Sequence, residues 1–299
     1  MRPRELLLLW VPVAISLLLI AGCASGGEEE AATTVADPAT TDTTATMPSV
    51  ALPEPGEPWD LLVISHALDL GDQFLEMYTQ RAEEALGVEV NAQYSGGLDQ
   101  FAWEILGMLR NEAYPGIGDL ARDAEIIVLI AYEVRSDQGE PTHIDVDGEH
   151  CSRYVSTQTP TPPAPTTAEY WQPYTDLLDD IYTEIWNLRE GTPTVLIAPD
   201  LHNRFLARQR DAGIDAECVA WTEAWSAVVR DAAERNGAAF VSLADLLSGP
   251  DHDIDAFEAG YTGASKQYPT IWWGTPNEIG TPMIVEAVAA AGFEPVTQP

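Results

Sequence analysis

The stretch WDLLVISHALDLGDQF, residues 59–74, decides the fold of this chain. An apolar run from Leu61 to Ile64 ends abruptly at Ser65 and His66, and a helical pattern begins a few residues later. A short continuous apolar run bounded by polar residues is typical of a strand that is buried on both faces. We therefore predict a buried strand that passes through a tight polar turn into a helix.

The same alternation of strand-like and helix-like segments continues along the chain. Strands are predicted at 61–65, 88–94, 125–131, 193–199 and 238–243, and helices at 72–86, 98–111, 168–190, 221–236 and 276–291. Strands that alternate with helices favour a parallel sheet with right-handed crossovers and helices on both faces. We predict one α/β domain over residues 58–299, a three-layer α/β/α sandwich with a mainly parallel central sheet.

A secretory signal peptide is predicted at residues 1–22, because two early arginines precede an apolar segment that ends in small residues before Cys23. The ending IAGC resembles a bacterial lipobox, which implies that cleavage leaves Cys23 as a lipid-modified N-terminus. Two alternatives stay open, an uncleaved membrane anchor and an ordinary signal peptide in which Cys23 is incidental. All three place the chain outside the cytoplasm.

The segment that follows, residues 23–57, is predicted to be a lipidated cysteine and a disordered tether rich in Thr, Ala, Pro and Glu. Random-coil scaling gives such a segment a reach of roughly 30 Å, enough to hold a domain clear of a membrane. Cys151 and Cys218 remain as an even pair in an oxidising compartment, so we predict a disulfide between them. Two unrelated free thiols are the alternative.

The charge excludes one class of partner. The chain carries 48 acidic and 14 basic side chains, a formal net charge of −34. A surface this acidic repels nucleic acid and anionic headgroups, so we expect no nucleic-acid partner and assign membrane attachment to the lipid.

Ligands of parallel α/β folds bind beyond the carboxyl ends of the strands, and Ser65 and His66 stand at such an end. The chain resembles the SGNH (GDSL-type) hydrolases over nearly all of 59–299. The resemblance is carried by four blocks: WDLLVIS, YSGGLDQFAWEILGMLRN, ARDAEIIVLIAYEVRSD and GTPNEIGTPMIVEAVAAAGFEP. It implies a flavodoxin-like topology and acyl hydrolysis by the serine of Gly-Asp-Ser, with the histidine of a late Asp-x-x-His motif as base.

In the first three blocks, this chain keeps one of the three functional residues of the family. Where the family has Gly-Asp-Ser this chain has Ser65-His66-Ala67, so the nucleophile position is alanine. The oxyanion glycine is matched by Gly97, and the oxyanion asparagine falls on Val134.

The last block has lost the base and its partner. The spacing to Pro276, Asn277 and Gly280 puts the family's aspartate on Trp272 and its histidine on Thr275. The resemblance therefore implies a pseudoenzyme. Ser65 and His66 are the fallback candidates for a rearranged catalytic pair.

Further residues are predicted to line or plug the former substrate cleft: Ser65, His66, Tyr132, Trp272 and Trp273. Trp103, Trp186, Trp221 and Trp225 lie in helical patterns and are expected to pack on the sheet. Asp251, Asp253 and Asp255 alternate as at the start of a calcium loop, but the glycine and glutamate of an EF-hand are missing, so we interpret them as an acidic turn. We predict no metal and no cofactor.

The sequence thus predicts an extracytoplasmic lipoprotein, anchored to the bacterial cell membrane, whose inactive hydrolase-like domain acts in binding or scaffolding. A carbohydrate or a small acyl compound is the candidate ligand. Two alternatives stay open: an active esterase or acetyl-carbohydrate hydrolase with rearranged residues, and a solute-binding lipoprotein. The oligomeric state is left undetermined.

Overall fold

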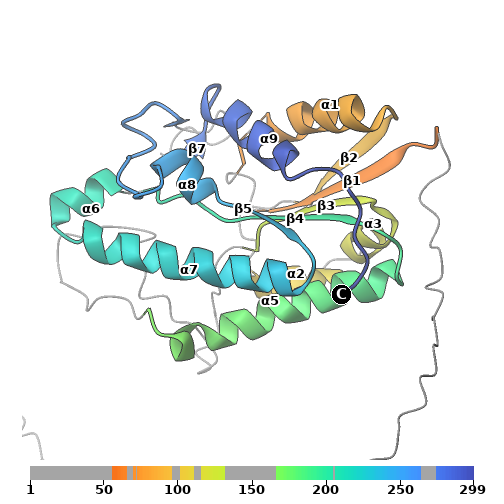
Figure 1. Cartoon of the computed structure of the whole chain (residues 1–299), viewed down its shortest axis with the longest axis horizontal. Coiled ribbons are helices and arrows are strands. Elements are labelled where there is room, and N and C mark those ends of the chain that lie inside the picture. Colours follow the sequence, from red (N-terminus) through yellow and green to blue (C-terminus); the bar gives the residue numbers. More distant parts are fainter. Residues whose placement is uncertain are drawn as a thin grey trace, which may run out of the picture. The chain divides into compact units, whose positions relative to one another are not determined.

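The predicted strand of the opening stretch is β1, Trp59–Ile64, and it lies inside a sheet of five parallel strands (Figure 1). The computed structural model describes residues 56–65, 70–71, 73–95, 102–110, 116–131, 166–204, 206–263 and 274–299, with only the backbone at 208 and 212. The other strands are β2 (Val90–Ser95), β3 (Ile126–Leu129), β4 (Val195–Pro199) and β5 (Ala239–Val241). Their order is β2-β1-β3-β4-β5, and every neighbouring pair is parallel.

Helices cover both faces of this sheet, which confirms the α/β class and the layered arrangement (Figure 1). One face carries α1 (Phe74–Leu86) and α9 (Gly280–Ala290). The other carries α2 (Ala102–Leu109), α3 (Ile117–Asp123), α5 (Ala168–Arg189) and α7 (Asp215–Arg235). Two short helices, α6 (Leu206–Ala212) and α8 (Leu243–Ser248), complete the described helices.

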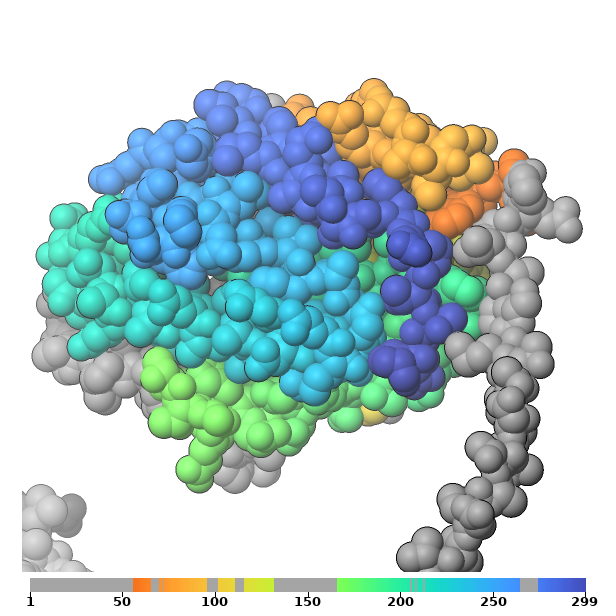
Figure 2. Space-filling view, viewed as in Figure 1, coloured from red at the N-terminus to blue at the C-terminus, as the bar shows by residue number. Residues whose placement is uncertain are grey.

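The apolar runs of the sequence form the centre of the core, because strands between two helical layers are covered on both faces. All four residues of β3 and all five of β4 are buried. Large helix side chains fill the space on either side of the sheet, among them Trp186, Tyr182 and Phe74. The two ends of the domain also meet, since α1 and α9 lie side by side on the surface (Figure 2) and Arg81 Nε donates to Glu286 Oε1 at 2.8 Å.

The structure corrects several predicted boundaries. The helix predicted at 98–111 ends at Leu109, while its predicted start at 98–101 lies outside the described residues. Helix α3 follows it and was not predicted. The helix predicted from 276 begins at Gly280, because Thr275–Pro276 form a short strand, β7, antiparallel to β6 (Thr262–Gly263). Helix α7 begins at Asp215 rather than at residue 221.

Of the four tryptophans that were predicted to pack against the sheet, three are buried or partly buried and one is exposed. Trp186 and Trp225 are buried, and Trp221 is partly buried against the core. Trp103 is 42% exposed, so the prediction that it packs on the sheet is wrong. It is the second residue of α2, and the buried face of that helix is supplied by its neighbours Ala102, Ile105 and Leu106.

Candidate functional site

The strand order places the opening stretch at the point where ligands of such sheets bind. From β1 the chain moves to one side to form β2 and then returns to the other side to form β3. In doubly wound sheets of order 2-1-3-4-5, the crevice beyond the carboxyl ends of strands 1 and 3 is the usual ligand site. Ser65 directly follows β1, and Ile130 and Ala131 follow β3 at the same edge.

Ser65 itself is held against the neighbouring strand. Its side chain is fully buried, and its Oγ lies 3.0 Å from the hydroxyl oxygen of Tyr94 on β2. The Tyr94 hydroxyl also donates to the Ser65 carbonyl oxygen at 3.2 Å. A serine nucleophile needs an accessible hydroxyl beside a base, and a hydroxyl buried between two strands does not provide one.

The segment after β1 packs against the last segment of the chain, and Gly71 makes the close approach possible. Gly71 has φ +93°, and a Cβ placed on it would lie 2.3 Å from Thr281 Oγ1 and 2.9 Å from the Pro276 carbonyl oxygen. Only glycine fits both the backbone conformation and the space. The segment that follows the first block of the resemblance is therefore a neighbour of the last block.

Thr275, where the resemblance puts the family's histidine, is part of this contact region. It is 2% exposed in β7, and its hydroxyl has no hydrogen-bond partner within the described part of the chain. Asn277 fixes the start of α9, because its Oδ1 accepts from the backbone N–H groups of Ile279 at 2.8 Å and Gly280 at 3.2 Å. Its Nδ2 donates to the Gly260 carbonyl at 2.9 Å, which ties the same turn to the preceding loop.

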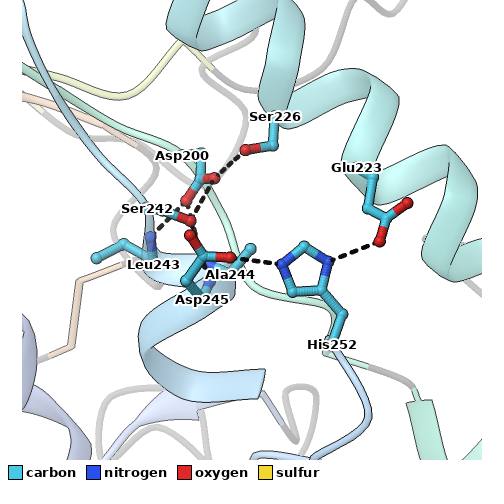
Figure 3. A network of polar contacts seen from close by, with 8 residues as sticks. All are labelled: Asp200, Glu223, Ser226, Ser242, Leu243, Ala244, Asp245 and His252. Atoms are coloured by element: carbon cyan, nitrogen blue, oxygen red, sulfur yellow. Dashed lines mark hydrogen bonds and ion pairs between the residues drawn. The ribbon is translucent and has the colours of Figure 1, made fainter. Parts of the chain in front are cut away.

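A buried carboxylate lies where β4 ends (Figure 3). Asp200 is fully buried; its Oδ1 accepts from the first backbone N–H groups of α8, at Leu243 and at Ala244 (3.1 Å). Its Oδ2 accepts from the hydroxyls of Ser226 on α7 and Ser242 before α8, the latter at 3.3 Å. Burial raises the pKa of Asp200 to about 6, although these four donors favour its charged form. The carboxyl group thus joins β4 to α7 and α8.

A buried histidine follows two residues later. His202 is 4% exposed, and burial lowers the pKa of its imidazole to about 3, with the positive charge of Arg204 adding to the effect and the adjacent backbone of Gly274 opposing it. The alkyl stem of Arg204 lies across Gly274, where a Cβ would meet it at 2.7 Å. A neutral imidazole therefore lies beside the backbone of Gly274, the residue that precedes Thr275.

Several predicted residues fall outside the described ranges. They are Cys23, His66, Ala67, Gly97, Tyr132, Val134, Cys151, Trp272 and Trp273. Cys218 is buried on α7. Because Cys151 lies outside the described residues, the pairing of these two cysteines stays a prediction.

The three aspartates of the acidic turn differ in their surroundings. Asp251 and Asp253 are exposed, whereas Asp255 is buried and accepts from the backbone N–H groups of Ala207 (2.6 Å), Phe257 (3.0 Å) and Glu258 (2.9 Å). Within the described ranges no three His, Cys, Asp or Glu side chains come together as metal ligands. No described helix is long and apolar enough to cross a membrane.

The fold is that of an α/β protein whose five parallel strands have the doubly wound order 2-1-3-4-5. In comparisons with known proteins, no family model, curated protein or solved structure matches the chain. Asp200 and His202 directly follow the predicted strand 193–199, but no local pattern in the sequence indicates the serines that bond to Asp200. The signal in the sequence that could have pointed to this group is an aspartate, Asp200, directly after a buried strand.

Proposed function

We propose that this chain is an extracytoplasmic lipoprotein whose SGNH-hydrolase-like domain binds a ligand at the carboxyl edge of its sheet without hydrolysing it. The observation that carries the proposal is the contact of Gly71 with Pro276 and Thr281. A serine–histidine pair of the SGNH kind requires the segment after β1 to meet the segment before α9. These segments meet here, and they carry Ala67 and Thr275 in place of the two reacting residues.

The residue types at these positions cannot support acyl transfer. Alanine has no nucleophile, and a threonine hydroxyl takes no proton near neutral pH. In subtilisin, removing the serine or the histidine alone costs about as much activity as removing the whole triad, because the three residues act as a unit. What remains of the arrangement can bind and orient a molecule.

An active esterase that uses Ser65 and His66 is the competing function. The burial of Ser65 and its contact with Tyr94 argue against it, because the hydroxyl would have to leave the sheet to attack a carbonyl. His202 is a poor substitute as base, because a pKa of about 3 makes its neutral imidazole too weak a base to take the proton of a serine hydroxyl.

Location and ligand follow from the sequence features. Lipidation of Cys23 would anchor the chain to the outer side of the bacterial cell membrane, with residues 24–57 as the tether. Metabolic labelling with an alkyne fatty acid tests this, with Cys23→Ala as the control that should carry no label. The ligand class is a carbohydrate or a small acyl compound.

Labelling by a fluorophosphonate probe, with p-nitrophenyl acetate turnover measured alongside, tests the loss of catalysis. The proposal expects no labelling in the wild-type chain and the same background turnover in Ser65→Ala. Labelling of the wild type that disappears in Ser65→Ala would establish the esterase instead. The variant Tyr94→Phe is the matched control, because it removes the hydroxyl that contacts Ser65 and leaves the serine in place.

A further inference from the structure

His252 lies between two carboxylates that come from different helices (Figure 3). Its Nε2 is 2.8 Å from Asp245 Oδ1 on α8, and its Nδ1 is 3.7 Å from Glu223 Oε1 on α7. The imidazole is buried, with the residue 7% exposed, whereas the two carboxylates are about half exposed, at 54% for Glu223 and 52% for Asp245. The ring therefore has one acidic side chain on each side, and both of these side chains are exposed to solvent.

The contacts of the ring indicate which nitrogen carries the proton. An ionised carboxylate only accepts hydrogen bonds, so the short contact with Asp245 places a hydrogen on Nε2. In the neutral ring, Nδ1 then holds a lone pair. This atom is buried and has no hydrogen-bond partner in the described part of the chain, yet it faces the Glu223 carboxylate.

We propose that His252 Nδ1 and the Glu223 carboxylate bind a divalent transition-metal ion such as Zn²⁺, with Asp245 as the group that orients the imidazole. Histidine ligands of metals commonly donate their other ring N–H to a carboxylate, which fixes the tautomer and raises the basicity of the coordinating nitrogen. The Asp245–His252 contact has this form, and it leaves the coordinating nitrogen aimed at a second ligand.

The separation of the two ligand atoms fits a shared ion. Zinc bonds to imidazole nitrogen and carboxylate oxygen are about 2.0–2.2 Å long, and two such bonds span the observed 3.7 Å at an angle of roughly 120°. The remaining positions would be taken by water, because Glu223 is open to solvent and no third ligand group is described there.

The chemistry of the pair selects the class of ion. One imidazole and one carboxylate suit Zn²⁺, Cu²⁺ or Ni²⁺, whereas Ca²⁺ and Mg²⁺ take sets of oxygen ligands. The net charge of −34 raises the local concentration of cations at the surface. The ion would also join α7 to the turn after α8, so its binding should stabilise the folded chain.

The same contacts admit one explanation without a metal. A doubly protonated imidazolium would donate to Asp245 and form an ion pair with Glu223. The two explanations differ in whether a metal ion binds, and this is what the experiment measures.

Isothermal titration of Zn²⁺ into the chelator-treated, full-length chain is the test. We expect one saturable site that is weakened at least tenfold in Glu223→Gln and in His252→Gln. Asp245→Asn should weaken it by about 10- to 100-fold, the usual effect of losing a group that orients a ligand. Asp251→Asn is the matched control, because it removes one negative charge from the exposed acidic turn and leaves the ligands in place, so it should bind Zn²⁺ like the wild type.

Two readouts complete the design. Zn²⁺ should raise the melting temperature of the wild type and of Asp251→Asn but not of Glu223→Gln, whose exposed helical position keeps the fold intact. Calcium at the same concentration should not displace Zn²⁺. Absence of saturable binding in the wild type, or equal binding in Glu223→Gln and His252→Gln, would overturn the proposal and leave the imidazolium explanation.

Discussion

Gly71 lies so close to Thr281 that a Cβ on Gly71 would fall 2.3 Å from the threonine hydroxyl oxygen. The contact joins the segment after β1 to the first turn of α9. These segments are far apart in the chain, and no local pattern relates them. The contact sets how closely the segment after β1 approaches the start of α9.

Replacing Gly71 by alanine tests this contact. We expect a loss of at least about 2 kcal/mol in the free energy of unfolding, because the new Cβ meets backbone as well as side-chain atoms and the φ of +93° is strained for alanine. Urea unfolding measures it. Gly87→Ala is the control: Gly87 also has a positive φ, +70°, but a Cβ there meets nothing within 4 Å. Its cost should be about 1 kcal/mol, and equal losses in the two variants would refute a steric role for Gly71.

Asp200→Asn should change how stability depends on pH. The pKa of Asp200 is about 6 in the folded chain, above its ordinary value of 3.8, so its stabilising effect is complete below pH 3.8 and is lost as the pH rises through 6. Relative to the asparagine variant, the wild type should therefore lose about 2 kcal/mol between pH 4 and pH 7. Denaturant unfolding at several pH values measures the difference. A difference between the wild type and Asp200→Asn that stays flat across this pH range would contradict the expectation.

His202→Gln should show the opposite trend. The folded pKa of His202, about 3, lies below the ordinary 6.5, so its contribution is complete above pH 6.5 and is lost as the pH falls toward 3. Acidification should therefore weaken the wild type relative to His202→Gln. Because Asp200 and His202 act in opposite directions between pH 4 and 6, their effects partly cancel in the wild type, and the single variants should diverge there. Parallel pH profiles for both variants would count against this assignment.

The predicted disulfide can be tested by thiol counting. If Cys151 and Cys218 are bonded, the denatured but unreduced chain should show no reactive thiol at either position. Cys151→Ala should then expose one thiol at Cys218 and cost about 2–5 kcal/mol, through the larger freedom of the unfolded chain. Mass spectrometry after alkylation, with and without reduction, measures this. Two alkylated cysteines in the unreduced wild type would show that they are free thiols.

The strands were predictable because their signal is local. Each predicted run overlaps a strand of the sheet, as 125–131 does with Ile126–Leu129, since a strand covered on both faces must be apolar along its length. Short helices were missed because contacts with distant residues, rather than a local pattern, decide where they begin. Helix α8 has six residues, and it begins where Ser242 caps the Asp245 N–H and Asp200 binds the N–H groups of Leu243 and Ala244.

The sequence by itself determined which chemical groups this protein has at each position: alanine and threonine where the resemblance expects serine and histidine, and an acidic surface. Only the tertiary structure decided which groups meet. Gly71 lies against Thr281, Ser226 donates to Asp200, and His252 stands between Asp245 and Glu223. Burial patterns repeat within a few residues and can be read along the chain, whereas contacts between distant polar side chains depend on how whole helices pack on the sheet.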